Sequence, residues 1–104
     1  MRLPKHRPPT HPGDMLRHEF LIPLGMSQKE LAERLNVSYP RVNELIHAKR
    51  RVTPDTALRL ARLFGTSAEF WLTGQLNYDL WHATRNSAEV INDIEPLRLS
   101  EGKR

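Results

Sequence analysis

The sequence predicts an all-α fold with a central pair of short helices within residues 27–47. No window of the chain alternates polar and apolar residues with a period of two, which is the pattern of a half-buried strand. Apolar residues instead recur three and four positions apart, as on one face of a helix. Ser or Thr precedes several of these apolar stretches, in the position that caps a helix. We therefore expect helices throughout and no sheet.

Composition is that of one small domain with tails. The chain has 104 residues, of which 38% are hydrophobic and 27% charged, enough for one modest core. No apolar run approaches the ~18 residues of a membrane span, and we expect no signal peptide. The absence of cysteine excludes disulfides and thiolate metal ligands. We therefore expect a protein of the cytoplasm.

Charge is distributed unevenly along the chain. The net charge is +4, and residues 28–62 carry eight basic side chains against four acidic ones. Residues 63–97 reverse this balance, with Arg85 as the single basic residue against five acids. A basic half beside an acidic half suggests two different partners. The alternative is an ordinary solvated surface.

The first segment is predicted to be an extended arm followed by a helix. Residues 1–12 hold four of the eight prolines, and proline fixes φ and removes a hydrogen-bond donor. Gly13 is expected to start the helix, with Asp14 in its first turn, where the helix dipole stabilises a negative charge. We expect Pro23 and Gly25 to end it.

The next two helix starts are marked by serines. Ser27 is expected to cap one helix, with Glu30 completing a capping box. Ser38 is expected to cap the next. Pro40 falls within its first turn, where an N–H has no intrahelical partner to lose. These two caps bound the central helix pair.

A fourth helix is predicted between Thr53 and Gly65. Thr53 occupies the capping position, and Pro54 takes the first helical position, which suits its fixed φ. The helix should run to Phe64, because Gly65 is a typical C-terminal stop.

A fifth helix is predicted to begin with a capping box formed by Thr66 and Glu69. Gly74 should weaken this helix in its middle. Trp71 and Trp81 are both expected in the core. The alternative, for Trp81 with its neighbours Tyr78 and Leu80, is the seam of a dimer.

The last apolar stretch is short and amphipathic, with Val90, Ile91, Ile94 and Leu97 as its apolar positions. Pro96 limits it, and residues 100–104 are expected to fray. Three fates are open for this face: it folds back on the core, pairs across a dimer, or holds a protein partner.

The central pair has the chemistry of a helix-turn-helix. Ala32 is small enough for two helices to cross closely, and Asn36 tolerates the left-handed conformation that the turn requires. Apolar residues of both helices then face one core: Leu31, Leu35, Val37, Val42 and Leu45. Any packed helix pair can imitate part of this pattern, but the combination favours a helix-turn-helix, whose second helix enters the DNA major groove.

The outer face of that second helix carries the polar residues expected to contact DNA. Arg41 and Asn43 are the predicted base contacts, because Arg matches guanine and Asn matches adenine through two hydrogen bonds. Gln28, on the preceding helix, is placed to donate to a phosphate. The full outer face consists of Ser38, Tyr39, Pro40, Arg41, Asn43, Glu44 and His47.

Three basic residues follow directly. Lys49, Arg50 and Arg51 come after the second helix, where the chain should pass the DNA backbone. We expect them to bind phosphates, which position a protein without specifying sequence. The alternative is a solvated basic loop.

Other chemistry finds little support. The five histidines lie at positions 6, 11, 18, 47 and 82, and no pair has the HExxH spacing of a zinc protease. Neither a Gly-rich phosphate loop nor a serine elbow motif is present. We therefore expect no metal, no cofactor and no enzymatic activity.

The chain also resembles a known family. The block SQKELAERLNVSYPRVNELIHAKRR resembles lambda-repressor-like (Cro/C1-type, XRE) DNA-binding domains. From about residue 8 to residue 83 the chain resembles the HigA antitoxins of bacterial type II toxin–antitoxin modules. The most specific matches are PPTHPGDML at 8–16, FLIPLGMSQ at 20–28 and KRRVTPDTALRLARLFGTSAEFWLTGQLNYDLW at 49–81.

This resemblance implies a five-helix, lambda-repressor-like fold that forms a homodimer and represses its own operon at an inverted repeat. It also implies a cognate HigB-like toxin, similar to the RelE-like mRNA endoribonucleases, that the protein neutralises by direct binding. Asn36 and Ala48 depart from the family pattern, since both occupy positions where glycine is common. The alternatives are a stand-alone regulator without a toxin and a protein-interaction adaptor.

The expected domain organisation has three parts. Residues 1–12 form the arm, residues 13–83 the helix-turn-helix domain, and residues 84–104 a C-terminal extension. The chemistry of the sequence says most about the middle part and least about the two ends.

Overall fold

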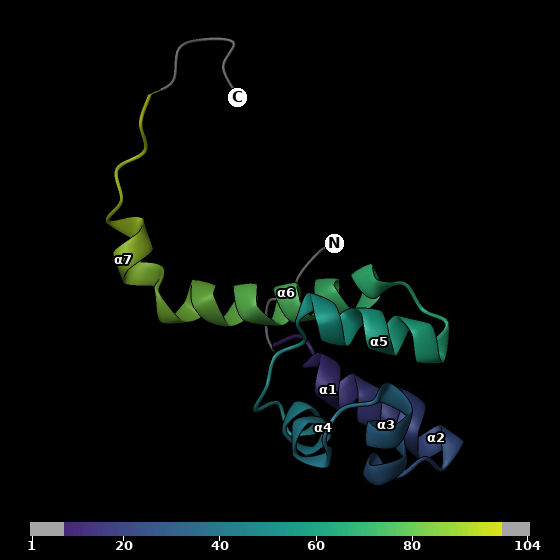
Figure 1. The fold of residues 1–104 in the computed structure, drawn as a ribbon. Coiled ribbons are helices and arrows are strands. Elements are labelled where there is room, and N and C mark those ends of the chain that lie inside the picture. Colours follow the sequence, from purple (N-terminus) through teal and green to yellow (C-terminus); the bar gives the residue numbers. More distant parts are fainter. Residues whose placement is uncertain (1–7, 99–104) are drawn as a thin grey trace.

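The computed structural model describes residues 8–98, and every regular element in that range is a helix (Figure 1). The elements are α1 (Pro12–Met15), the π-helical turn η1 (Leu16–Leu21), α2 (Ile22–Leu24), α3 (Gln28–Leu35), α4 (Tyr39–Ile46), α5 (Pro54–Phe64), α6 (Ala68–Asn86) and α7 (Ala88–Asn92). The predicted all-α class is confirmed. Within residues 8–98, no helix has the length and apolar content needed to cross a membrane.

The first three elements form one continuous helix from Pro12 to Leu24. It begins one residue earlier than predicted, because His11 caps it by accepting a hydrogen bond from the Gly13 N–H at 2.9 Å. Pro23 was expected to end the helix but lies inside its last turn. Proline cannot donate to the carbonyl four residues back, and the turn before it is widened to π geometry. The helix ends at Gly25, which has a φ of 63°.

The core is a single cluster drawn from η1, α3, α4, α5 and α6, with Val52 from the loop before α5. Leu16, Leu31, Leu60 and Trp71 are fully buried within it. The indole Nε1 of Trp71 donates to Thr66 Oγ1 at 2.7 Å, so the polar atom of this large side chain is paired. The prediction that Trp71 lies in the core is therefore confirmed.

The start of α6 differs from the prediction. Ser67, rather than Thr66, caps the helix, and its Oγ accepts from the Phe70 N–H at 3.0 Å. The Thr66 hydroxyl instead accepts a hydrogen bond from the Trp71 indole. Gly74 does not interrupt the helix, which continues to Asn86 and so crosses the predicted boundary at residue 83.

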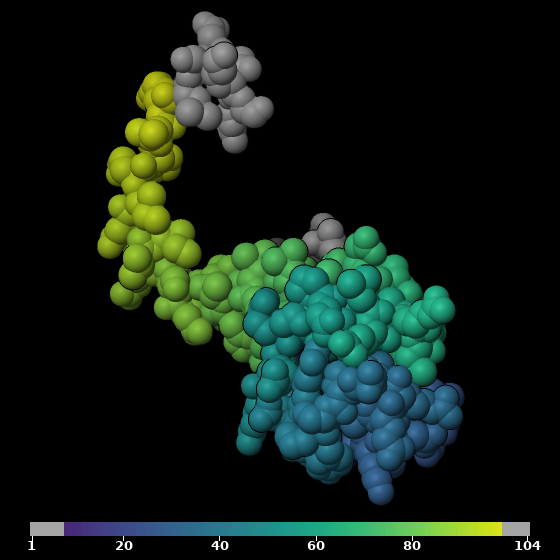
Figure 2. Space-filling view, in the orientation of Figure 1, coloured from purple at the N-terminus to yellow at the C-terminus, as the bar shows by residue number. Residues whose placement is uncertain are grey.

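The C-terminal end stands off the body of the molecule. Helix α6 lies beside α5 in its first half, and α7 and the residues after it extend away from the rest (Figures 1 and 2). Val90, Ile91, Ile94 and Leu97 are each at least half exposed. The apolar face of this segment therefore does not pack on the core. Of the three possibilities named above, pairing across a dimer and binding of a protein partner remain. The predicted parts at residues 1–7 and 99–104 lie outside the described residues.

Candidate nucleic-acid interface

Local capping fixes the geometry of the α3–α4 pair. Ser27 Oγ accepts from the Glu30 N–H at 3.0 Å and starts α3. Asn36 ends α3 with a φ of 60°, in the left-handed region that the sequence predicted. Ala32, at the helix crossing, is buried. The helix-turn-helix geometry is therefore the one that the capping residues predict.

The N-terminal tip of α4 is exposed. Ser38, just before the helix, uses its Oγ as a cap by accepting from the backbone N–H of Arg41 at 3.3 Å. The next residue, Tyr39, is half exposed, and Pro40 beside it is exposed as well. An aromatic ring and a proline are thus presented at the end of the helix that would enter a groove.

A hydrogen bond joins the two helices on their polar side. Asn43 Nδ2 on α4 donates to Gln28 Oε1 on α3 at 3.0 Å, and both residues are only partly buried. Within residues 8–98, the Gln28 amide nitrogen and the Asn43 amide oxygen have no hydrogen-bond partner. The structure thus brings these two predicted DNA contacts together and leaves each with a group for a ligand.

The side chain of Arg41, which we predicted to contact a base, is hydrogen-bonded within the protein rather than free. Its Nη2 donates at 2.8 Å to both Asp55 Oδ2 and Thr56 Oγ1 at the start of α5. The side chain is 28% exposed. The hydrogen bond from Arg41 is the largest cause that lowers the pKa of Asp55, followed by that from Arg59. This carboxylate is therefore charged at neutral pH.

Lys49, Arg50 and Arg51 lie in the exposed turn after α4. The chain enters this turn through Ala48, which adopts a φ of 60°. Arg50 forms a 2.8 Å ion pair with Glu44 of α4, and Arg51 pairs with Asp79 of α6. The side-chain ammonium of Lys49 has no hydrogen-bond or ion-pair partner among residues 8–98, although the Lys49 backbone N–H donates to the Glu44 carbonyl oxygen at 2.8 Å. Of the three predicted phosphate ligands, Lys49 is therefore the one whose charge is uncompensated.

His47 is the remaining predicted contact. It follows the last turn of α4 and is exposed, and its Nδ1 lies 2.8 Å from the backbone carbonyl oxygen of Asn43. That hydrogen bond holds the ring against the end of the helix, on the same exposed end of α4 as Lys49.

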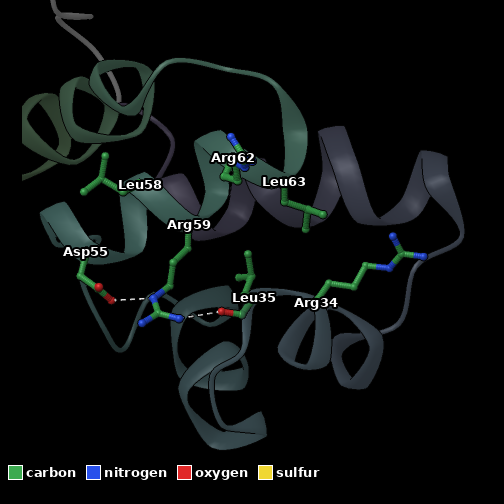
Figure 3. Close-up of a pocket in the computed structure, with 7 residues that line it drawn as sticks. All are labelled: Arg34, Leu35, Asp55, Leu58, Arg59, Arg62 and Leu63. Carbon is green, nitrogen blue, oxygen red and sulfur yellow. Dashed lines mark hydrogen bonds and ion pairs between the residues drawn. The ribbon is translucent and has the colours of Figure 1, made fainter.

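Sequence reasoning missed the α5 residues that hold this surface together. Arg59 Nε donates to Asp55 Oδ2 at 2.9 Å, and Arg59 Nη1 donates to the carbonyl oxygen of Leu35 at 2.8 Å (Figure 3). Arg59 Nη1 also lies 3.3 Å from the carbonyl oxygen of Asn36, to which it donates. Arg59 thereby satisfies carbonyls that the end of α3 leaves unpaired. One signal was present: Asp55 is an isolated acid in a basic stretch of sequence.

The same residues line a surface hollow of about 490 Å³ between α3 and α5 (Figure 3). Its walls combine arginine with leucine, and the lining residues are Arg34, Leu35, Asp55, Leu58, Arg59, Arg62 and Leu63. This hollow lacks an arrangement of nucleophile, base and oriented partner that catalysis would need. Among residues 8–98, no group of three His, Cys, Asp or Glu side chains is placed to hold a metal ion.

The fold and the α3–α4 pair define a helix-turn-helix domain of the lambda-repressor type. The family model described as helix-turn-helix (HTH_3) matches residues 18–71. Antitoxin HigA-1 of Vibrio cholerae is 38% identical over 100 residues, which cover 96% of this chain and 93% of that protein. The chain belongs to the HigA antitoxin family within the helix-turn-helix proteins.

Two further similarities agree with this assignment. Virulence-associated protein I of Dichelobacter nodosus is 48% identical over 90 residues, which cover 86% of this chain and 82% of that protein. The structure of Pseudomonas aeruginosa antitoxin HigA with the higBA promoter matches with a TM-score of 0.82 and 43% identity. That match covers 86% of this chain and 99% of the other.

Proposed function

We propose that the protein is the antitoxin of a type II toxin–antitoxin module, which represses its own operon and neutralises a HigB-like mRNA endoribonuclease by direct binding. One observation carries this proposal. The α3–α4 pair presents an exposed, polar, capped helix beside a basic turn, in a chain 43% identical to an antitoxin solved with promoter DNA. We further propose that it acts in the cytoplasm, without a cofactor and without catalysis.

The proposed DNA contacts fall into two groups. The tip of α4 and its polar side, with Ser38, Tyr39, Pro40, Arg41 and Asn43, would face base edges in the major groove. The other group consists of Gln28, His47, Lys49, Arg50 and Arg51, which would contact the phosphate backbone. Phosphate contacts would give affinity and salt dependence, whereas the base contacts would select the sequence.

A homodimer would place two such helices on an inverted repeat. Their half-sites are expected ~10 bp apart, or at a multiple of that distance, since successive major grooves face one side of the duplex at that interval. The exposed apolar residues Leu76 and Leu80 of α6 are the proposed dimer surface, because a helix this apolar on its outer face favours burial against a partner. Occupancy of the operator would then exclude polymerase.

The acidic C-terminal half is the proposed region for encounter with the toxin. Residues 63–97 carry five acids against Arg85 alone, and this charge would accelerate association with a basic ribonuclease. Such complementarity affects the association rate more than the affinity.

The test is a binding titration with two labelled duplexes. One duplex is the DNA directly upstream of the protein's own gene, and the other is a shuffled duplex of the same length and composition. We expect tighter binding to the upstream duplex, with two chains per site and steep salt dependence. Equal affinity for both duplexes would contradict autorepression. Co-expression with a neighbouring ribonuclease gene separately tests neutralisation, because a stand-alone regulator would not restore growth.

A further inference from the structure

The guanidinium of Arg41 makes hydrogen bonds within the protein through one of its three nitrogens, and the other two have no acceptor among residues 8–98. Nη2 donates to Asp55 Oδ2 and to Thr56 Oγ1, both at 2.8 Å. Thr56 is 5% exposed, so the end of the arginine is seated against the body of α5. An arginine has five N–H donors, and within residues 8–98 neither Nε nor Nη1 of Arg41 has an acceptor. Three donors of a fixed plane therefore remain for a ligand.

Asp55 is itself fixed from a second direction. Arg59 donates to the same oxygen, Asp55 Oδ2, at 2.9 Å and also binds the carbonyl of Leu35 at 2.8 Å (Figure 3). The carboxylate thus connects the start of α5 with the recognition helix α4, and through Arg59 with the end of α3. A side chain held by two arginines has little freedom to follow Arg41 if Arg41 moves.

We infer that Asp55 is a specificity-determining positioning residue, which acts on DNA through Arg41. This inference rests on the proposed function. A two-point contact to guanine requires an oriented guanidinium, and an arginine already held in place loses less side-chain entropy when it makes that contact. A contact from the same guanidinium to a phosphate would carry no sequence information. By holding Arg41 in one orientation at the tip of α4, Asp55 would favour the contact that selects the sequence.

The charge of Asp55 acts in the same direction. It is ionised at neutral pH, because the arginine hydrogen bonds keep its pKa below the ordinary value. A carboxylate beside Arg41 neutralises part of the attraction that a free guanidinium would have for phosphates of any sequence. Loss of Asp55 should therefore weaken binding to the operator while leaving binding to unrelated DNA unchanged or stronger.

A purely structural pair would behave differently. The ion pair of Arg41 and Asp55 has side chains 28% and 58% exposed, and exposed pairs contribute little to folding stability. We therefore expect Asp55→Asn to fold with nearly unchanged resistance to urea. A change in the ratio of two DNA affinities is a readout that a small loss of stability does not produce.

The experiment compares Asp55→Asn, Arg41→Ala and the double variant in the titration with upstream and shuffled duplexes. Glu30→Gln is the matched control, because it also removes one negative charge beside an arginine, Arg34, at 3.3 Å, and glutamine retains the capping-box chemistry at that position. Arg41→Lys is a second variant that keeps the charge but lacks the planar fork, and it tests the inference if Asp55→Asn does not fold.

We expect Asp55→Asn to reduce the ratio of upstream to shuffled affinity about tenfold, within the discrimination of one two-point base contact. Arg41→Lys should reduce it similarly, and Asp55→Asn should have no further effect in the Arg41→Ala background. Glu30→Gln should change both affinities by the same factor.

Three results would overturn the inference: Asp55→Asn behaves like Glu30→Gln, its effect persists without Arg41, or both affinities rise together. Retention of the full ratio by Arg41→Lys would also overturn it. If the wild-type protein fails to distinguish the two duplexes, the proposed function fails instead, so the two failures are separable.

Discussion

Gly13 in the first helix lies against the backbone carbonyl of Leu45 near the end of α4. A Cβ atom placed on Gly13 would lie 1.7 Å from the Leu45 oxygen and 2.7 Å from its carbonyl carbon. Both atoms belong to the backbone, so no change of rotamer can relieve the contact. The close packing of the first helix on the recognition helix therefore depends on the absence of a side chain at residue 13.

We predict that Gly13→Ala lowers the free energy of unfolding by about 3 kcal/mol or more, since the two helices must separate to admit a methyl group. Urea unfolding monitored by helical circular dichroism measures this. An unchanged midpoint would contradict the packing described here.

Gly74 provides the matched control. It lies in the middle of α6, and an added Cβ would be 3.4 Å from Pro12 Cγ and 3.8 Å from Met15 Cε, which are ordinary contacts. Gly74→Ala should therefore raise the free energy of unfolding by about 0.5–1 kcal/mol through helix propensity. The same substitution is thus expected to have opposite signs at the two glycines.

Local features of this fold were predictable because their causes lie within four residues of sequence. The caps Ser27, Ser38 and Thr53 and the left-handed turn at Asn36 all formed as expected. The cap of α6 shows where such reasoning stops. Thr66 and Ser67 are both good caps by chemistry; in the fold Ser67 caps α6, and the Thr66 hydroxyl accepts from the indole of Trp71, a contact that the capping pattern does not predict.

The sequence could predict which side chains lie on the exposed face of α4, but not which hydrogen bonds they make with other helices. Spacing alone places Arg41 on the outer face of this capped helix. Its partner Asp55 lies 14 residues away, and their contact depends on how α4 meets α5. The same limit applies to Arg59 and Leu35, which are 24 residues apart. Side-chain pairs between helices require the helix packing to be known first.

The turn after α4 carries a backbone cost at Ala48. This residue has a φ of 60°, a conformation that disfavours a Cβ atom. We predict that Ala48→Gly raises the free energy of unfolding by about 1 kcal/mol. Asn36 also has a φ of 60°, but Asn36→Gly should raise the free energy of unfolding less, because asparagine tolerates the left-handed region better than alanine. Equal gains at both positions in urea unfolding would contradict this explanation.

Stability should depend on pH through His11. Its Nδ1 accepts from the Gly13 N–H and must be unprotonated to do so. Burial lowers the pKa of His11 below 6.5, and the nearby carboxylates of Asp79 and Asp14 oppose this only in part. Near and below pH 6.5, His11 therefore binds more protons in the unfolded chain than in the folded one. The free energy of unfolding should accordingly fall as the pH drops below about 6.5.

The measurement is urea unfolding between pH 8 and pH 5, with His11→Asn as the control. Asparagine also caps helices but does not titrate in this range. The carboxyls of Asp55 and Asp79 have pKa values below 3.8 and stay charged throughout. A pH dependence of the same size in His11→Asn would assign it to another histidine.

Dimer formation should be sensitive to the outer face of α6. Leu80 is 49% exposed on this helix, and we predict that Leu80→Glu weakens self-association at least tenfold, since a charge would be buried at the seam. Sedimentation equilibrium measures the dissociation constant. Leu24→Glu is the control, because Leu24 is 60% exposed at the C-terminal end of α2, and α2 lies away from α6 (Figure 1). Equal effects of the two variants would place the dimer surface elsewhere.

Lys49 and Asn43 should affect DNA binding in different ways. Lys49 has an uncompensated charge in the turn after α4, so Lys49→Ala should weaken binding to upstream and shuffled duplexes alike and reduce the salt slope by about 1. Asn43 carries no charge, and Asn43→Ala should cost about 1–3 kcal/mol on the upstream duplex alone, with the slope unchanged. Fluorescence anisotropy at several salt concentrations separates the two effects. If Lys49→Ala instead lost affinity only for the upstream duplex, Lys49 would be assigned to a base contact rather than to a phosphate contact.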